Sequence, residues 1–263
     1  RLYHNNGDGT FTDVTTESKM DSRGHYGQGV ATGDYDNDGD VDLYLTNFRA
    51  NQLYRNNGDG TFTEVGQQTS VADPSWSTSA TFFDHDRDGY LDLYVVNYVD
   101  YSLTEAYPIC YDGKIRSYCH PRFFQGVPDR LYRNNGDGTF QDVTVAAGLT
   151  REGFSASATW LDYDNDGNPD LYVVRYLEYI PHLARPCSEN GVRVYCHPRI
   201  FNGQGDLLYR GKGDGSFEDV SRKAGISRAG PADGKGLGVV AADFDGDGLQ
   251  DLYVTNDTTS NFL

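Results

Sequence analysis

Two short motifs alternate four times along this chain of 263 residues, and they predict an all-β fold, a β-propeller built from four-stranded blades. One motif has a Leu-Tyr pair, a turn of Asn, Gly and Asp, and a Phe-x-x-Val segment. The other is an Asp-rich loop that runs directly into a second Leu-Tyr pair. Helical patterns are nearly absent, apart from short Ala-Gly stretches near Ala146 and Ala224. We therefore expect one repeat domain over 1–263.

Each repeat carries the signals of four strands. A run of small or apolar residues precedes each Asp loop, and an apolar segment beginning with Leu-Tyr follows it. The other motif supplies two more strands, joined by Asn-Gly and Asp-Gly dipeptides whose glycines can adopt the positive φ of tight hairpins. The Asp-loop repeats span 34–47, 84–97, 162–175 and 243–256. With two inserts removed they recur about every 50 residues, a period typical of propeller blades and longer than that of the rival parallel β-solenoid.

Each Asp loop places Asp at positions 1, 3, 5 and 9 and Gly at position 6. Carboxylates this close repel one another unless a cation lies between them, and a hard cation with roughly six to eight oxygen ligands, such as Ca²⁺, fits the set. The side chain at position 7 varies, as expected if only its backbone carbonyl binds the ion. Position 12, where an EF-hand has a bidentate Glu, is Leu or Val. The pattern therefore predicts calcium loops between strands, and the fourfold repetition disfavours the alternative of merely solvated acidic turns.

About four calcium ions are expected, each bound by the carboxylates at positions 1, 3, 5 and 9 and by the carbonyl at position 7. The expected carboxylate ligands are Asp34, Asp36, Asp38, Asp42, Asp84, Asp86, Asp88, Asp92, Asp162, Asp164, Asp166, Asp170, Asp243, Asp245, Asp247 and Asp251, and the expected carbonyl ligands belong to Asp40, Tyr90, Asn168 and Leu249. The Asp residues of the other motif have no companion carboxylates at metal spacing, so hairpin geometry explains Asp8, Asp59, Asp137 and Asp214.

Two inserts, at about 98–130 and 176–207, interrupt the repeats, and each contains a Cys, eight further residues and a Cys-His-Pro triplet. Recurrence of one spacing predicts two local disulfides, formed in an oxidising compartment by the pairs Cys110–Cys119 and Cys187–Cys196. Haem attachment is an alternative, but its usual spacing between the cysteines is about two residues. Zinc is a second alternative, although each insert offers only three Cys and His ligands.

Charge and composition exclude some partners. The chain has 39 acidic and 22 basic residues and a formal net charge of -17, a poor surface for nucleic acid. Its apolar residues form no run long enough for a transmembrane helix. The chain opens on Arg1 inside a motif, so we expect a mature or excised segment.

The combination DxDxDGxxDLY followed by LYxNNGDGTFxDV resembles the FG-GAP or VCBS repeat, the blade unit of integrin α-subunit-like propellers, in all four copies. The segments at 118–133 and 195–210, of the form YCHPRxFxGxxDxLYR, are similar to those of secreted bacterial relatives of cartilage acidic protein, the ASPIC/UnbV group. The resemblance implies a calcium-stabilised extracellular propeller, often of seven blades, and no catalytic residues. Because open strand edges invite pairing, we expect the repeats to belong to a larger ring. The alternative is a four-bladed ring closed by the first and last segments.

The function expected from these features is a non-enzymatic binding or adhesion module, extracellular, periplasmic or on the cell surface, that contacts a protein or a glycan. One alternative is a structural subunit of an extracellular assembly, in which self-association uses insert aromatics: Tyr107, Tyr111, Tyr118, Phe123, Phe124, Tyr195 and Phe201. Substituting Phe123 or Phe124 is then expected to leave folding intact. A secreted propeller enzyme is the second alternative, but the sequence shows no nucleophile elbow, no HExxH and no unrepeated carboxylate pair.

Overall fold

The fold is known from a computed structural model. It describes residues 1–20, 24–101, 111–112, 115–116, 124–178, 187–189, 192–194, 196–227 and 234–263. Within these ranges every strand pairing is antiparallel, and the α-helical structure is one short segment, α1 (Thr144–Ala147), near the expected Ala146. The stretch near Ala224 forms turns instead of a helix. The prediction of an all-β protein is confirmed.

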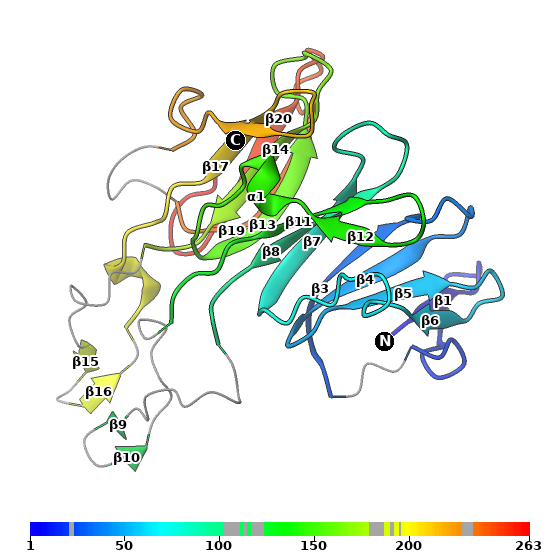
Figure 1. Cartoon of the computed structure of the whole chain (residues 1–263). Helices are drawn as coiled ribbons and strands as arrows, with labels where there is room; N and C mark the ends of the chain where they lie inside the picture. The colour runs from blue at the N-terminus through cyan, green and yellow to red at the C-terminus, as the bar shows by residue number, and fades with distance from the viewer. Residues whose placement is uncertain are drawn as a thin grey trace.

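Three complete four-stranded blades follow one another along an arc (Figure 1). Their strands, from the inner to the outer edge, are β3 (Tyr26–Gly33), β4 (Asp42–Phe48), β5 (Gln52–Asn56) and β6 (Phe62–Glu64) in blade 1; β7 (Ser77–Phe83), β8 (Asp92–Asn97), β11 (Arg130–Asn134) and β12 (Phe140–Asp142) in blade 2; and β13 (Ser155–Leu161), β14 (Asp170–Arg175), β17 (Leu207–Gly211) and β18 (Phe217–Asp219) in blade 3. The inner strand of each blade contacts the inner strand of the next, as expected for a propeller.

Two further pairs of strands lie at the two ends of the arc. The hairpin of β1 (Tyr3–Asn5) and β2 (Phe11–Asp13) precedes blade 1, and the hairpin of β19 (Gly236–Ala242) and β20 (Asp251–Asn256) follows blade 3. These hairpins are separate two-stranded sheets at opposite ends of the arc (Figure 1). They do not pair with each other, so the alternative of a four-bladed ring closed by the first and last segments is not formed.

The repeated Leu-Tyr pairs determine the strand register. Tyr44 lies opposite Leu53 in blade 1, and the equivalent pair in blade 2 is Tyr94 and Leu131. Both residues of each pair are buried. A shift of one residue would move these side chains to the opposite face of the sheet, so the motif specifies the same pairing in each blade.

The core lies between the blades because successive side chains of a strand point to opposite faces of its sheet. In β8, Leu93 and Val95 belong to the cluster shared with blade 1, whereas Tyr94 and Val96 belong to the cluster shared with blade 3. All four side chains are at most 2% exposed. A third cluster joins blade 3 to the last hairpin through Val254. Each blade is therefore stabilised by its neighbours.

A buried carboxylate ties the strands together at the end of the blade away from the Asp loop. The Oδ2 atom of Asp129 accepts a hydrogen bond of 2.9 Å from the Tyr94 hydroxyl, and its Oδ1 atom accepts one of 2.8 Å from the Asn97 backbone N–H. In blade 3 the hydroxyl of Tyr172 donates to Asp206 in the same way, at 2.8 Å. This Asp precedes the Leu-Tyr pair by two residues in both blades, so the repeat carries a second, structural acid.

The inserts leave the blades on the side opposite the β3–β4 and β7–β8 connections (Figure 1). The second insert contains the hairpin of β15 (Cys187–Glu189) and β16 (Val192–Val194), and the first contains the short pair β9 (Tyr111–Asp112) and β10 (Ile115–Arg116). A disulfide joins Cys187 to Cys196, with their Cα atoms 5.2 Å apart, which confirms that predicted pair.

Several residues singled out in the inserts lie outside the described part of the chain, and for these the predictions stay untested. They are Cys110, Cys119, Tyr107, Tyr118, Phe123 and Tyr195.

Phe124 belongs to a buried cluster, so this ring packs into the core and is not available for self-association, and its substitution is expected to cost stability, contrary to the expectation from the sequence. The ring is 9% exposed, packs at 5.0 Å from the ring of Tyr101, and shares a cluster with Val99, Phe154 and Leu177. The insert holds several aromatic residues, and nothing in its sequence distinguishes the ring that returns onto the blades from those expected to mediate self-association.

We expect Phe124→Leu to lower the free energy of unfolding by about 1 kcal/mol, because it leaves a small cavity in this cluster. Urea unfolding measures the change. Phe11→Leu, at a ring that is 63% exposed, is the control and should have almost no effect. Equal stability of the two variants would show that Phe124 contributes no core packing.

Candidate metal centres

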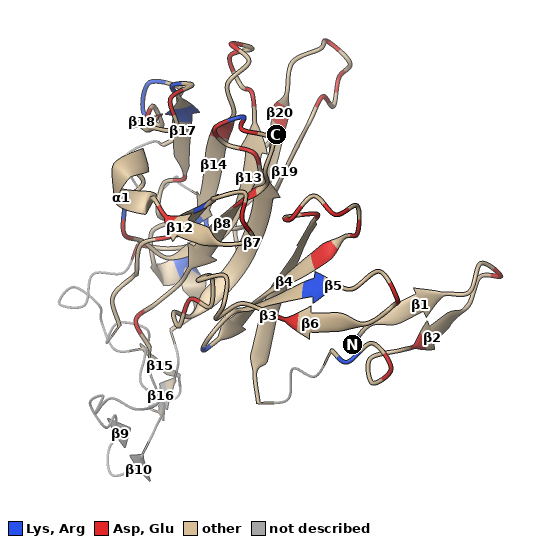
Figure 2. Cartoon of the chain, turned by 45° about the vertical axis from the view of Figure 1, so that its right-hand side comes forward, with Lys and Arg blue, Asp and Glu red and all other residues tan. Residues whose placement is uncertain are grey.

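The four Asp loops connect the two inner strands of each blade and of the last hairpin. They are loop 1 (34–42), loop 2 (84–92), loop 3 (162–170) and loop 4 (243–251). Acidic residues gather at these connections (Figure 2). All four loops lie within the described residues, so their geometry can be compared position by position.

The Asp at position 1 closes its own loop. In loop 1 the Oδ1 atom of Asp34 accepts from the backbone N–H of Asp38 at 3.1 Å, and its Oδ2 atom accepts from that of Gly39 at 2.9 Å. The same two bonds occur in the other loops. Gly39 has a φ of 93°, a conformation that costs a glycine little, which explains the Gly at position 6.

The Asp at position 9 ties the loop to the third strand of the blade. The side chain of Asp42 is fully buried, and its carboxylate accepts from the backbone N–H groups of Tyr35 at 3.1 Å and Asn56 at 2.8 Å. Asp170 accepts from Tyr163 and Gly211 in the same arrangement. Burial raises the pKa of Asp42 and of Asp170 to about 6. Each therefore has a structural role beside any part in binding a metal.

The Asp at position 5 holds the peptide of position 7. The Oδ1 atom of Asp38 accepts from the backbone N–H of Asp40 at 2.9 Å, and Asp88 accepts from Tyr90 at 3.0 Å. Loops 3 and 4 repeat this bond. A turn of this kind fixes the orientation of the peptide at position 7, the residue whose carbonyl was predicted to be a ligand.

Ligand atoms from three positions converge in every loop. In loops 1, 3 and 4 the carboxylates of positions 1, 3 and 9 offer oxygens that lie within 4.8 Å of one another. In loop 2 positions 1, 3 and 5 converge instead. The structure thus brings together most of the predicted ligands, and position 5 joins such a group in loop 2.

The residues of loop 1 fit a cation. The Oδ1 atom of Asp36 is buried and accepts no hydrogen bond from the described residues. Burial, followed by the nearby charge of Asp38, raises the pKa of Asp36. Buried carboxylate oxygens without donors are destabilising unless a positive charge lies beside them. A hard divalent cation bound by oxygen would supply that charge.

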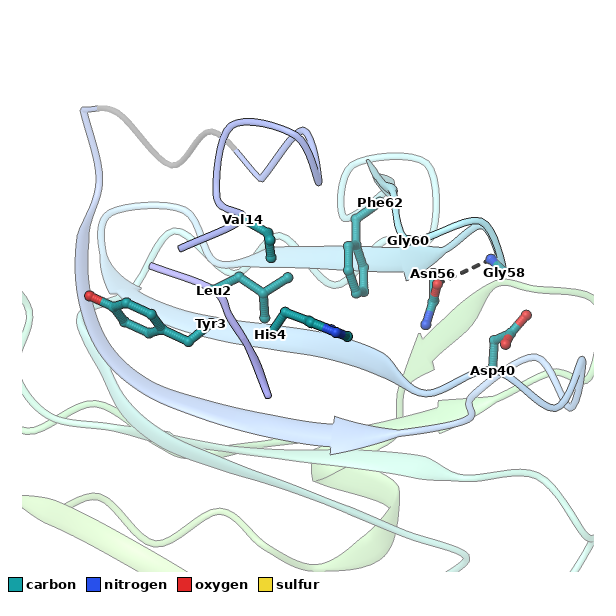
Figure 3. Close-up of a pocket in the computed structure, with 9 residues that line it drawn as sticks. All are labelled: Leu2, Tyr3, His4, Val14, Asp40, Asn56, Gly58, Gly60 and Phe62. Atoms are coloured by element: carbon teal, nitrogen blue, oxygen red, sulfur yellow. Dashed lines mark hydrogen bonds between the residues drawn. The ribbon is translucent and has the colours of Figure 1, made fainter. Parts of the chain in front are cut away.

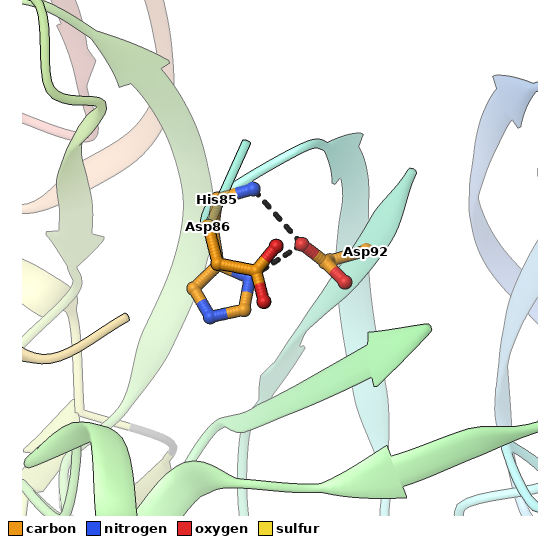
Figure 4. A group of neighbouring side chains, drawn as sticks. All are labelled: His85, Asp86 and Asp92. Atoms are coloured by element: carbon orange, nitrogen blue, oxygen red, sulfur yellow. Dashed lines mark hydrogen bonds and ion pairs between the residues drawn. The ribbon is translucent and has the colours of Figure 1, made fainter. Parts of the chain in front are cut away.

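His85, at position 2 of loop 2, is a residue that sequence reasoning missed. Its Nδ1 atom contacts the Oδ2 atom of Asp92, and its backbone N–H donates to the same oxygen at 2.9 Å (Figure 4). The ring stacks on Phe217 of blade 3, with centroids 6.2 Å apart. The side chains of His85, Asp86 and Asp92 also offer possible metal-ligand atoms that lie within 4.8 Å of one another. Because its Nδ1 atom already contacts Asp92, we assign His85 to packing between blades, a role that its single occurrence in the motif did not indicate.

Arginines of the Leu-Tyr-Arg motif are the second missed feature. The Nε atom of Arg133 lies 3.2 Å from Asp86 Oδ2, and the Nε atom of Arg210 lies 2.7 Å from Asp164 Oδ2. In both blades the next residue along the strand donates its backbone N–H to the Asp at position 9 of the loop. Recurrence of Arg at this place in three copies of the motif was the available signal.

The turn residues of the other motif behave as hairpin geometry requires. Asp8 accepts from the backbone N–H of Thr10 at 2.9 Å and from its hydroxyl at 2.6 Å. Asp59, Asp137 and Asp214 repeat this arrangement. The bonds to Thr10 lower the pKa of Asp8. These residues stabilise turns.

A cavity of about 310 Å³ lies between the first hairpin and blade 1 (Figure 3). Its lining consists of Leu2, Tyr3, His4, Val14, Asp40, Asn56, Gly58, Gly60 and Phe62. Its titratable lining residues are Tyr3, His4 and Asp40, and Asp40 is the position-7 residue of loop 1.

Calcium binding is expected to weaken as the pH falls through about 6. Protons and calcium compete for the same carboxylates, and Asp42 and Asp170 have pKa values of about 6. The folding stability of the metal-free chain depends on pH in the opposite direction. Its stability should fall as the pH rises from about 4 to 6, because the unfolded carboxyl ionises first.

Isothermal titration at pH 7.5 and pH 5.5 measures the change in affinity, and two buffers of different ionisation enthalpy measure the protons released. Tighter binding at the lower pH, or binding without proton release near pH 6, would contradict this assignment.

Among the described residues, no helix has the length and apolar character needed to cross a membrane.

The chain is similar to cartilage acidic protein 1 of Homo sapiens and of Mus musculus, with 28% identity over 192 residues in each case. The match covers 71% of this chain and 25% and 26% of those proteins, so the chain spans about a quarter of the length of these curated relatives.

A solved structure concerning recognition of non-reducing terminal N-acetylglucosamine by an Agrocybe aegerita lectin aligns with 96% of this chain and 67% of its own, at 16% identity and a TM-score of 0.34. This similarity is too low to support a conclusion about the fold or the ligand of this chain. The family described as FG-GAP-like repeat matches residues 1–45, 34–95, 124–173 and 199–254, more than half of the chain. The chain therefore belongs to the FG-GAP-like repeat family.

Proposed function

We propose that this chain is a calcium-stabilised propeller module that binds a protein or a glycan outside the cytosol and catalyses no reaction. The observation that carries the proposal is the convergence of three carboxylates in each of four loops, with the buried Oδ1 atom of Asp36 in loop 1, which accepts no hydrogen bond from the described part of the chain. Bound calcium would supply the positive charge that offsets repulsion among these carboxylates.

The loops would then fix the blades without taking part in recognition. Positions 1 and 5 close each loop, and position 9 attaches loops 1 to 3 to the third strand of their blades. A cation held by the same carboxylates would make these attachments more rigid. The consequence is a stiff scaffold whose other side is available to a partner.

The hairpin of the second insert offers a surface suited to binding a partner. The β15–β16 hairpin is closed by the Cys187–Cys196 disulfide and exposes two apolar side chains, Val192 at 64% and Val194 at 40%. Exposed apolar residues on a constrained hairpin are suited to a contact surface, since little conformational entropy is lost on binding. The disulfide also supports an oxidising compartment, and we propose an extracellular or periplasmic location.

The proposal is tested by binding of the calcium-loaded chain to immobilised glycans and to a panel of extracellular matrix proteins. Val192→Asp with Val194→Asp should reduce binding to the probes that retain the wild-type chain, with an unchanged melting temperature. Val145→Asp, at a side chain that is 78% exposed in α1, is the matched control and should bind normally. Equal binding by both variants would show that the insert hairpin is not the contact surface.

A further inference from the structure

Loop 3 differs from the other loops because an arginine of its own blade bridges two of its carboxylates. Arg210 extends from β17, with its Nε atom 2.7 Å from Asp164 Oδ2 and its Nη2 atom 2.6 Å from Asp166 Oδ2. These carboxylates occupy positions 3 and 5. The Oδ1 atom of Asp166 already accepts the backbone N–H of Asn168 at 2.8 Å, so both oxygens of Asp166 have donors.

A local departure in the sequence explains this contact. The residue after Arg210 is Gly211, where blades 1 and 2 have Asn56 and Asn134. A Cβ atom on Gly211 would lie 2.2 Å from the carbonyl oxygen of Pro169, far inside van der Waals contact. The absence of a side chain therefore lets β17 lie against loop 3 and brings the guanidinium to both carboxylates. In blade 2, where Asn134 has a side chain, Arg133 lies at 3.2 Å from a single carboxylate, that of Asp86.

A second guanidinium also reaches loop 3. Arg87 of loop 2 donates to the carbonyl oxygen of Gly167 at 2.8 Å and to the side-chain oxygen of Asn168 at 2.5 Å. Loop 3 thus contacts two arginines.

Loop 1 has weaker compensation from its own arginine. Burial raises the pKa of Asp36 and the charge of Arg55 partly offsets that rise, but within the described residues Arg55 forms no ion pair with a carboxylate of the loop, and the buried Asp36 Oδ1 atom has no donor there.

We propose that Arg210 acts as an internal cation in loop 3, so that loop 3 binds calcium more weakly than loop 1 and fills after it. This inference rests on the proposed calcium function. A calcium ion that uses the Oδ2 atoms of Asp164 and Asp166 competes with the guanidinium for those oxygens and is repelled by its charge. In loop 1 no ion pair between Arg55 and the corresponding oxygens competes in this way among the described residues. Loop 1 therefore fills before loop 3 as calcium rises.

The test follows each loop separately by NMR during a calcium titration of the full chain. The N–H groups of Gly39 and Gly167 donate to the position-1 carboxylates of loops 1 and 3, so their shifts report on those loops. In the wild-type chain Gly39 should reach saturation at lower calcium than Gly167. Arg210→Met should raise the affinity of loop 3 by roughly five- to ten-fold and leave loop 1 unchanged. Arg133→Met, the matched control in blade 2, should not change loop 3.

Gly211→Asn is the second variant, because it keeps Arg210 and moves β17 away from loop 3. It should also raise the affinity of loop 3. Simultaneous saturation of the two loops, or an unchanged or lower affinity of loop 3 in Arg210→Met, would overturn the inference and show that Arg210 instead positions the carboxylates for calcium. If neither Gly39 nor Gly167 responds to calcium, the proposed calcium function itself fails, and the inference fails with it.

Discussion

Replacing Asp129 with Ala is expected to lower the free energy of unfolding by about 3 kcal/mol. The substitution leaves two buried donors without an acceptor, the hydroxyl of Tyr94 and the backbone N–H of Asn97. Asp206→Ala should have a similar effect in blade 3, because the hydroxyl of Tyr172 donates to that carboxylate. Urea unfolding monitored by tyrosine fluorescence and circular dichroism measures both changes.

Asp137→Ala is the control for these variants. It removes a carboxylate whose bonds to Thr139 lie in an exposed turn, so the expected loss is below about 1 kcal/mol. If Asp129→Ala were no less stable than Asp137→Ala, the buried carboxylate would not hold the strands of blade 2 together.

The pH dependence of Asp129 gives a second readout of the same site. Burial raises its pKa to about 6, against the effect of the N–H of Asn97 and the hydroxyl of Tyr94. The folded pKa exceeds the unfolded value of about 3.9, so this group makes the chain lose stability as the pH rises from about 4 to 6. Asp129→Asn should remove that part of the pH dependence, which unfolding curves at pH 4.5 and pH 6.5 would show.

Removing calcium is expected to lower the melting temperature by at least about 10 °C. A ligand at 100 times its Kd stabilises a protein by about 2.7 kcal/mol per site, and 1 kcal/mol corresponds to about 2–4 °C for a chain of this size. Loss of the ions also restores repulsion among carboxylates within 4.8 Å of one another. Differential scanning calorimetry with excess calcium and with excess chelator measures the shift.

Adding calcium back should restore the original melting temperature, and the same concentration of magnesium should restore less, because Mg²⁺ demands a more regular octahedral shell. A melting temperature that is the same with and without the chelator would mean that the loops are closed by their hydrogen bonds alone.

The four strands of each blade could be predicted from the sequence because the signals that mark them are local. Turn dipeptides set the outer hairpins, and the alternation of Leu and Tyr placed side chains such as Leu93 and Tyr94 on opposite faces. Local signals do not show whether the first and last hairpins pair with each other. Their motifs are complete in the sequence, but whether they pair depends on the curvature of the whole arc.

The loop geometry was predictable in part. Spacing identified the carboxylates, yet it did not show that Asp42 binds the backbone N–H of Asn56, a residue on another strand. The same limit applies to Arg210, whose contact with loop 3 depends on the close approach of Gly211 to Pro169. Phe124 was misjudged because the sequence of its aromatic-rich insert does not show which ring returns to the core. In each case the missing information was a contact between segments distant in the sequence.

Calcium content of the purified chain tests the central claim most directly. After equilibration with excess calcium and rapid gel filtration, elemental analysis should find about four ions per wild-type chain. The variant with Asp34→Asn, Asp36→Asn and Asp38→Asn should bind about three, since it disables loop 1 alone and keeps Asp42, which ties that loop to its blade. Less than one ion per wild-type chain, or equal calcium in the variant, would contradict the assignment of the Asp loops as calcium sites.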